Sequence, residues 1–164
     1  NGDNESEVQI FFSSNHIMFD FDSTLVVSRL IEGEYFRISQ MLSSDYETKV
    51  SVNRRTFLDS IERASILIRE NDKKPIIITI SDEGMQLKMN SAFGTMSAEV
   101  GITKYGKDLM IGFNPKFLID ALRIIDDEEV TLYMMNPKSP CFIKDEEENY
   151  IYLILPVNFN AAAV

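Results

Sequence analysis

The chain has 164 residues, 45% of them hydrophobic and 26% charged, which is the balance of a globular protein with one domain or slightly more. Its formal net charge of −10 argues against strong binding to nucleic acid, which needs Lys and Arg, unless the charge is unevenly spread. No apolar run approaches the ~20 residues that span a bilayer, and the beginning, Asn1–Glu5, does not have the pattern of a signal peptide.

The first third of the chain is predicted to form three strands and no helix. Apolar and polar residues alternate over Val8–Phe12 and Ile17–Asp22, a turn is expected at 13–15, and a third strand is expected over Leu25–Ile31. Three strands with one apolar face do not make a complete domain. Because the chain also lacks an initiator Met, we expect a fragment of a longer protein, with residues 160–164 as a tail.

After about residue 49, a strand, a helix and three strands are predicted twice in succession. The helices are expected over residues 54–70, with Asn53 as N-cap, and over residues 115–126, with Asn114 as N-cap and Pro115 in the first turn. The strands are predicted at Val50–Asn53, Pro75–Ser81, Met85–Asn90, Thr95–Thr103, Leu109–Phe113, Val130–Met135, Cys141–Lys144 and Tyr150–Val157. Two βαβββ units predict an α+β fold with its helices on one face of antiparallel sheets.

Both predicted helices are amphipathic, and they carry a different charge from the rest of the chain. Helix 54–70 has a net charge of +1 and helix 115–126 a net charge of zero, so the remainder carries −11. This distribution suits a protein that meets DNA weakly along one surface, although ordinary solvated helix faces explain it equally well. Ile66 falls on the polar side of its helix, where it has no core role. The expected core residues are Phe57, Ile61, Ala64, Ile68, Leu118, Ala121, Leu122 and Ile125.

No pattern of residues predicts a catalytic or metal site. The one histidine, His16, lies at a predicted turn, and the one cysteine, Cys141, is expected to be a buried, inert thiol in a reducing cytoplasm. The acids at 145–148 are expected to form a solvated turn, and Asp20 and Asp22 to lie on the exposed face of a strand. We therefore expect no catalytic residue, no metal and no cofactor.

The end of the chain carries a nearly continuous apolar run over Tyr152–Val157, followed by Asn158 and Phe159. Such a run is typical of a buried central strand. Its exit through Pro156 and Val157 leaves apolar groups near the end of the chain, where a groove for a partner peptide is expected.

Four motifs, in the same order and at matching spacings, resemble the bacterial β sliding clamp, the β subunit of the replicative DNA polymerase. They are Leu30–Tyr35, Arg63–Leu67, Ile111–Phe117 and Tyr152–Val157. The resemblance covers about residues 5–159. It implies a DNA-clamp fold in which residues 1–45 are the last strands of the middle domain and residues 46–159 the whole third domain.

The resemblance also implies a non-catalytic processivity factor of the bacterial cytoplasm, associated with the nucleoid. A head-to-tail homodimeric ring would encircle double-stranded DNA weakly and recruit polymerase, clamp loader and other proteins through short peptides. The residues that resemble the family's DNA-facing positions are Arg55, Arg63, Lys116 and Arg123, and those that resemble its ring interface are Ile66 and Leu67. The residues that resemble its peptide groove are Phe36, Gln40, Met41, Asn114, Phe117, Pro140, Leu153, Leu155, Pro156, Val157 and Asn158.

Two functions of other classes stay compatible with the sequence. A peptide- or single-strand-binding adaptor would display an aromatic stacking platform, whereas the Phe residues here alternate at core-like positions. An acid-dependent hydrolase needs a cleft with converging carboxylates, which no spacing in the chain predicts. Helices gathered on one side of continuous sheets would favour the clamp.

Overall fold

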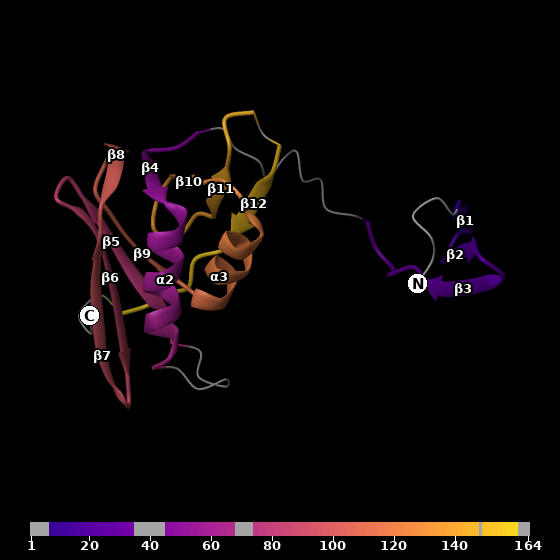
Figure 1. The fold of residues 1–164 in the computed structure, drawn as a ribbon, viewed down its shortest axis with the longest axis horizontal. Helices are drawn as coiled ribbons and strands as arrows, with labels where there is room; N and C mark the ends of the chain where they lie inside the picture. Colours follow the sequence, from indigo (N-terminus) through magenta and orange to yellow (C-terminus); the bar gives the residue numbers. More distant parts are fainter. Residues whose placement is uncertain (1–6, 35–44, 68–73, 148, 161–164) are drawn as a thin grey trace. The chain divides into compact units, whose positions relative to one another are not determined.

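The computed structural model divides the chain into two compact units, Asn1–Leu42 and Ser43–Val164, both drawn in Figure 1. Within the described residues, no helix is both long enough and apolar enough to cross a bilayer. The residues whose structure is described are 7–34, 45–67, 74–147 and 149–160.

The first unit is a three-stranded antiparallel sheet, as the alternation of its residues predicted. Its register places Ile10, Phe19 and Val26 side by side on one face. All residues of these strands are exposed or half-buried, so the described part of this unit has no buried core. The strands are β1 (Gln9–Phe12), β2 (His16–Phe21) and β3 (Thr24–Arg29).

The hairpin between β2 and β3 corrects the expectation about Asp20 and Asp22. β2 ends at Phe21, and Asp22 and Ser23 form the two-residue connection with φ of 44° and 62°. Positive φ at both positions is typical of a type I′ turn, whose twist matches that of the flanking strands. Asp22 is therefore a turn residue and does not share a strand face with Asp20.

The second unit consists of two βαβββ repeats and one additional strand, β8, among its described residues. The first repeat contains β4 (Thr48–Asn53), α2 (Arg54–Ser65), β5 (Ile76–Ser81), β6 (Gly84–Ser91) and β7 (Gly94–Val100). The second follows β8 (Ile102–Gly106) and contains β9 (Leu109–Phe113), α3 (Pro115–Ile124), β10 (Glu129–Met134), β11 (Cys141–Lys144) and β12 (Ile151–Ile154).

Both helices begin where the sequence predicted. The Asn53 Oδ1 accepts the backbone N–H of Thr56 at 3.0 Å, and the Asn114 Oδ1 accepts that of Lys116 at 3.0 Å. Pro115 lies in the first turn of α3, where its missing N–H would have had no helical partner. Each cap satisfies a backbone donor that the first turn leaves free, so these local signals define the start of each helix.

The ends of the helices differ from the prediction. α2 ends at Ser65, and its predicted continuation over 68–70 lies outside the described residues. α3 ends at Ile124 instead of residue 126, because Ile125 adopts an extended conformation and is buried. The chain thus leaves α3 as soon as its next apolar side chain can enter the core.

The two repeats exchange their first strands. The sheets have the orders β12-β11-β10-β4-β8 and β7-β6-β5-β9. β4 opens the first repeat but pairs with β10 of the second, with Thr48 opposite Met134, and β9 opens the second repeat but pairs with β5 of the first, with Phe113 opposite Ile76. Neither repeat can therefore complete its sheet alone.

The single strand predicted over Thr95–Thr103 is wrong, because the chain forms two strands there. β7 pairs with β6 in the four-stranded sheet, while β8 pairs with β4 at the edge of the five-stranded sheet. The change of sheet takes place at Gly101, between the two strands. An alternating pattern reports which residues point inward, and it contains no information about which sheet they belong to.

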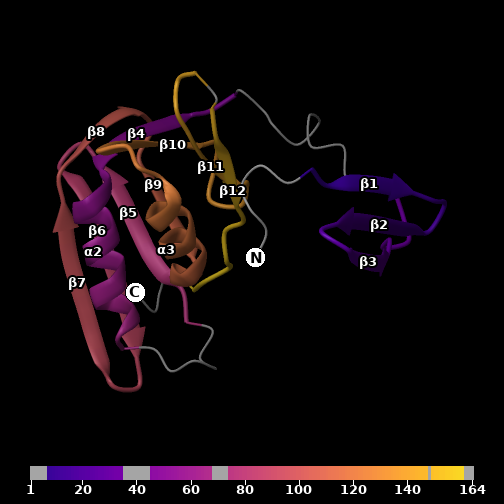
Figure 2. The same cartoon turned by 45° about the vertical axis from the view of Figure 1, so that its right-hand side comes forward.

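The core lies between the helices and the inner faces of the two sheets. Alternate residues of each strand are buried, as Val50 and Val52 are in β4, and the apolar stripes of α2 and α3 cover this inner side (Figures 1 and 2). The predicted α+β architecture, with its helices on one face of antiparallel sheets, is confirmed. All predicted helix core residues that the structure describes are buried, namely Phe57, Ile61, Ala64, Leu118, Ala121, Leu122 and Ile125.

Arg54, the first residue of α2, joins the two helices at one end. Its Nε donates to the carbonyl oxygen of Asp127 at 2.7 Å and its Nη1 to that of Leu122 at 3.1 Å. These carbonyls belong to the last turn of α3 and the loop after it, where the partial negative charge of the helix end lies. A guanidinium group from the first repeat therefore supplies hydrogen-bond donors to carbonyl oxygens at the end of the helix of the second repeat.

We expect Arg54→Met to lower the free energy of unfolding by about 1–3 kcal/mol, because two charge-assisted hydrogen bonds to backbone carbonyls, one of them part-buried, are lost. The measurement is urea unfolding followed by circular dichroism at 222 nm. The matched control is Arg55→Met, which removes the same charge from an exposed side chain without a hydrogen bond to the described residues. Its effect should stay within about 0.5 kcal/mol, and equal losses for both variants would contradict the role of Arg54.

Candidate functional site

The exposed surface of the two helices holds all four basic residues predicted to face DNA. α2 and α3 lie side by side in Figures 1 and 2 and are in contact with each other. Arg55 and Arg63 are exposed on α2, and Lys116 and Arg123 are exposed on α3. The structure therefore gathers four positions from two distant segments onto one helical layer.

One of these four basic groups is engaged by an acid of the same layer. The Glu62 Oε1 accepts from both Nε and Nη2 of Arg123, at 3.1 and 2.7 Å. Glu62 lies on the polar side of α2, and its partner stands 61 residues further along the chain, a pairing that no local pattern indicates. The pair neutralises Arg123, so less positive charge is available than the residue count suggested.

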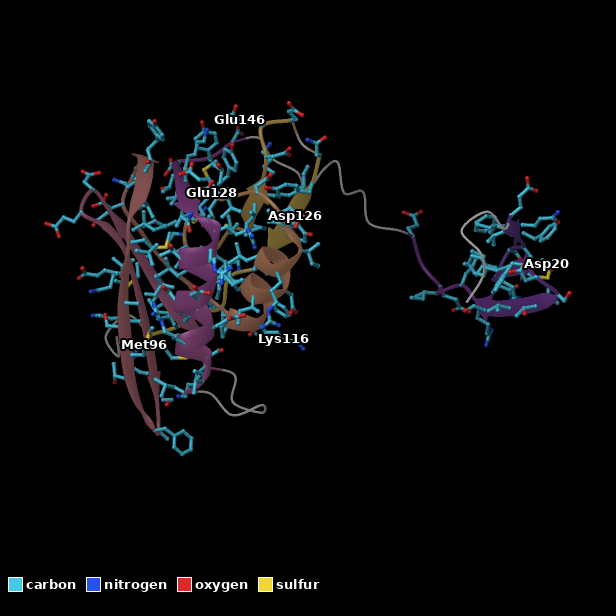
Figure 3. All side chains as sticks on the ribbon, in the orientation of Figure 1. Asp20, Met96, Lys116, Asp126, Glu128 and Glu146 are labelled. Carbon is cyan, nitrogen blue, oxygen red and sulfur yellow. The ribbon has the colours of Figure 1, made fainter. Side chains whose placement is uncertain are left out.

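The ends of α3 differ in charge. Figure 3 shows Lys116 near one end of α3 and Asp126 beyond the other, and Asp127 and Glu128 follow Asp126 in the chain. Asp120 adds an exposed carboxylate between the ends. The helical layer is therefore nearly balanced in charge, with a modest basic excess toward α2 and the beginning of α3.

The groove residues that the resemblance implies, where the structure describes them, come from three segments that the fold brings toward each other. The register of β11 and β12 pairs Cys141 with Ile154, which places the flanking Pro140 and Leu155 next to each other. Leu155 is 60% exposed and Leu153 half-buried. The predicted positions Phe36, Gln40 and Met41 lie outside the described residues.

The predicted strand over Tyr150–Val157 is wrong at its end, because β12 stops at Ile154. Beyond it, the Val157 N–H donates to the carbonyl oxygen of Gly112 in β9 at 2.8 Å. Gly112 lies two residues before Asn114, so the segment after β12 passes close to the beginning of α3, as Figure 2 shows. The segment after β12 leaves the five-stranded sheet and reaches β9 of the four-stranded sheet. Its apolar groups therefore stay near the surface.

The start of α3 contributes the other described groove positions. Asn114 is half-buried because its side chain caps the helix, and Phe117, one turn into α3, is 52% exposed. Phe117 and Leu155 are thus large apolar side chains without full cover, which is the property that a peptide-binding wall requires. A pocket of ≈ 260 Å³ also adjoins the last groove position, Asn158, and its lining residues are Lys74, Pro75, Ile77, Lys88, Asn90, Asn158, Phe159 and Asn160.

Ile66, predicted to face away from the core, is 80% exposed directly after α2. Leu67 follows it, is half-buried and donates its N–H to the carbonyl oxygen of Ala64 at 3.2 Å. An isolated exposed Ile is common on protein surfaces, so exposure alone does not assign it a role. Its assignment to a ring interface stays a prediction.

Cys141, Asp145 and Tyr150 have structural roles. Cys141 is fully buried, and burial raises the pKa of its thiol to about 12, so it is the inert thiol that was predicted. The Asp145 Oδ1 accepts the N–H of Asn149 at 2.8 Å within the acidic turn. The Tyr150 hydroxyl donates to Asp127 Oδ2 at 2.7 Å, and burial together with this carboxylate raises the pKa of Tyr150.

Carboxylates line two adjoining pockets: one of ≈ 420 Å³ is lined in part by Asp127, Glu129, Asp145 and Glu146, and one of ≈ 310 Å³ at the end of α3 is lined in part by the three carboxylates of Asp126, Asp127 and Asp145. The hydrogen bonds from Tyr150 and Asn149 engage two of these three carboxylates. Within the part of the chain that the structure describes, no three or more His, Cys, Asp or Glu side chains are grouped as a metal site. These contacts give no support to a hydrolase.

Comparisons with known proteins agree with this arrangement. Residues 39–158 match the family described as DNA polymerase III beta subunit, C-terminal domain. A beta sliding clamp of Staphylococcus aureus is 34% identical over 158 residues, which are 94% of this chain and 42% of that protein. The chain therefore spans less than half the length of the curated relatives that it matches.

Solved structures show the same similarity. A crystal structure assigned to a DNA polymerase III beta subunit from Eubacterium rectale is 62% identical, with a TM-score of 0.86 over 98% of this chain and 44% of that one. The DNA polymerase sliding clamp from Bacillus subtilis is 28% identical, with a TM-score of 0.82 over 97% of this chain and 43% of that one. With its family model, its fold and its relatives in agreement, the chain belongs to the DNA polymerase III beta subunit family and contains that family's C-terminal domain.

Proposed function

We propose that the chain is part of a replication processivity factor that encircles duplex DNA as a segment of a ring and recruits other proteins through a peptide groove. The match of residues 39–158 to the family's C-terminal domain carries this proposal. In it, residues 1–45 are the last strands of the middle clamp domain, residues 46–159 the third domain and residues 160–164 a tail. The factor is non-catalytic and acts in the bacterial cytoplasm, at the nucleoid.

The helical layer of α2 and α3 is the surface proposed to face DNA. A ring that slides must hold the duplex by topology, and many phosphate contacts would slow it. The internal pairing of Glu62 with Arg123 and the acids around α3 support this reading, because they limit the positive charge available to phosphates. Binding of duplex DNA to the isolated chain should therefore be weak and sensitive to salt.

We expect Glu62→Gln to strengthen duplex binding, because it releases Arg123 for a phosphate contact. The plot of log K against log salt concentration should steepen by about 1, the contribution of one added phosphate contact. Fluorescence anisotropy with a labelled duplex at several salt concentrations measures this slope. Glu99→Gln, the same change of charge at an exposed position of β7, is the control. If Glu99→Gln steepened the slope equally, the effect would reflect net charge and not the freed Arg123.

The exposed apolar groups beyond β12 and at the start of α3 are proposed as one wall of the peptide groove. Leu155, Pro156 and Val157 form it together with Phe117, while Phe36 and Met41 are carried over from the family by position alone. Burying two large apolar side chains of a peptide contributes roughly 1.5–3 kcal/mol each before association costs. The chain spans 42% of the length of the Staphylococcus aureus relative. We therefore expect part of the groove to be formed by residues that this chain does not contain, and we expect this chain to bind a peptide at micromolar affinity or weaker.

We expect a short Gln-x-x-Leu-Phe-type peptide to bind the chain, and truncation after Leu155 to abolish this binding. The truncation removes Pro156 and Val157, but it leaves β12 and the core intact. Isothermal titration calorimetry or an NMR titration measures the affinity, and a chain truncated after Asn160 is the matched control. Equal binding by both truncated chains, or NMR shifts confined to α2 and α3, would exclude the groove and favour a different adaptor function.

Ile66 and Leu67 are proposed to lie at the surface that closes the ring between two copies of the complete protein. The support is an apolar side chain that is 80% exposed at the end of α2, where no core packing accounts for it. Removing water from such a group on dimerisation would be favourable, whereas leaving it exposed has no benefit for the fold.

In the complete protein, Ile66→Ala with Leu67→Ala should raise the dimer dissociation constant at least about tenfold, because apolar area buried between copies is lost. Sedimentation velocity over a concentration series measures the shift from dimer to monomer, and circular dichroism verifies that the fold is intact. Ile124→Ala is the control, since Ile124 is also largely exposed but lies on α3. An unchanged dimer would return Ile66 to the class of ordinary exposed residues.

A further inference from the structure

The residues after β12, Leu155–Asn160, form a C-terminal strap that crosses to the other sheet. The Val157 N–H donates to the Gly112 carbonyl at 2.8 Å, so the strap is attached to the outer edge of β9. β9 pairs with β5 on its other side, and the strap therefore covers an edge that would otherwise present unpaired backbone groups.

A close contact between Phe159 and Gly112 holds the same strap. A Cβ at position 112 would lie 2.7 Å from Phe159 Cδ1, 3.0 Å from the Val157 carbonyl oxygen and 3.2 Å from Ile77 Cδ1. Carbon atoms do not approach as closely as 2.7 Å without displacement, so the ring of Phe159 occupies the place of the missing side chain.

The backbone of Gly112 gives no other reason for glycine. It is an interior residue of β9 and is not among the glycines with a positive φ. Glycine inside a strand weakens the strand unless another group needs the space, and close approach of another segment is such a need. The ring of Phe159 thus packs directly on the backbone of Gly112, in the space that a side chain at position 112 would occupy.

We propose that Phe159 is a positioning residue, which holds the strap on β9 so that Leu155, Pro156 and Val157 are presented in a fixed arrangement to a partner peptide. This inference rests on the proposed peptide-binding function. Leu155 is 60% exposed and lies outside the buried core cluster, so burial of its own side chain does little to hold the strap in place. When a binding-competent arrangement is only partly populated, the apparent affinity falls by the same fraction, and anchoring avoids this loss.

The decisive change is Gly112→Ala in the full chain. The added methyl group displaces Phe159 and presses on the Val157 carbonyl, whereas its other neighbour, Ile77 Cδ1, is the end of a flexible side chain. Gly101→Ala is the matched control, because a Cβ there meets no atom within 4 Å and the residue has no positive φ. Phe159→Ala removes the ring that packs on Gly112. Phe159→Leu keeps a large apolar side chain at this position and should therefore keep the strap attached.

The first readout does not depend on any partner: hydrogen exchange at the Val157 amide, measured by NMR. We expect Gly112→Ala and Phe159→Ala to accelerate it about tenfold or more, since the strap opens locally, while amides of β5 and thermal unfolding change little. Gly101→Ala and Phe159→Leu should resemble the parent. The double variant Gly112→Ala with Phe159→Ala should add little to either single change, because both act on one contact. Exchange at Val157 that stays unchanged in both single variants would overturn the proposal.

The second readout is the affinity for the Gln-x-x-Leu-Phe-type peptide. It should fall about tenfold in Gly112→Ala and Phe159→Ala and recover in Phe159→Leu, which a general loss of structure would not produce. Accelerated exchange with unchanged affinity would overturn the positioning role. If the parent chain bound no peptide, the proposed groove would fail, whereas the exchange data would still decide whether Phe159 anchors the strap.

Discussion

The exchange of first strands between the two repeats is the constraint on which the second unit depends. β4 completes the sheet of the second repeat and β9 that of the first, with partners such as Thr48 and Met134 far apart in sequence. Each sheet therefore requires the other repeat before it can form. Pairing strands that are far apart in the chain costs conformational entropy before burial of the core offsets this cost. We therefore expect folding to be slow and highly cooperative.

This constraint also decides what the two surfaces of the unit can do. Because both sheets present their apolar faces inward, α2 and α3 must lie together over the same core, and their polar sides form one continuous layer. Arg54 and the pair of Glu62 with Arg123 then connect the helices across that layer. Part of the positive charge on these helices is therefore engaged within the fold, which is compatible with the proposal that this surface lies along DNA without binding it tightly.

The C-terminal strap shows how the same topology supplies a second surface. β12 and β9 are edge strands of different sheets. The short segment after β12 joins them through the hydrogen bond from Val157 to Gly112 and the packing of Phe159 on Gly112. Apolar side chains such as Leu155 consequently remain near the surface instead of entering the core. The strap thus both protects the edge of β9 and presents the wall of the proposed groove.

The sequence by itself determined the local features of this protein. Alternation and helical periodicity gave the strands and the inward faces, and Asn53 and Asn114 gave the starts of the helices, because these signals act between residues close in the chain. Only the tertiary structure decided that residues 95–103 divide between two sheets, that Arg123 is held by Glu62, and that Gly112 lies under Phe159. Those outcomes depend on which distant segments meet, and a pattern of near neighbours contains no record of that choice.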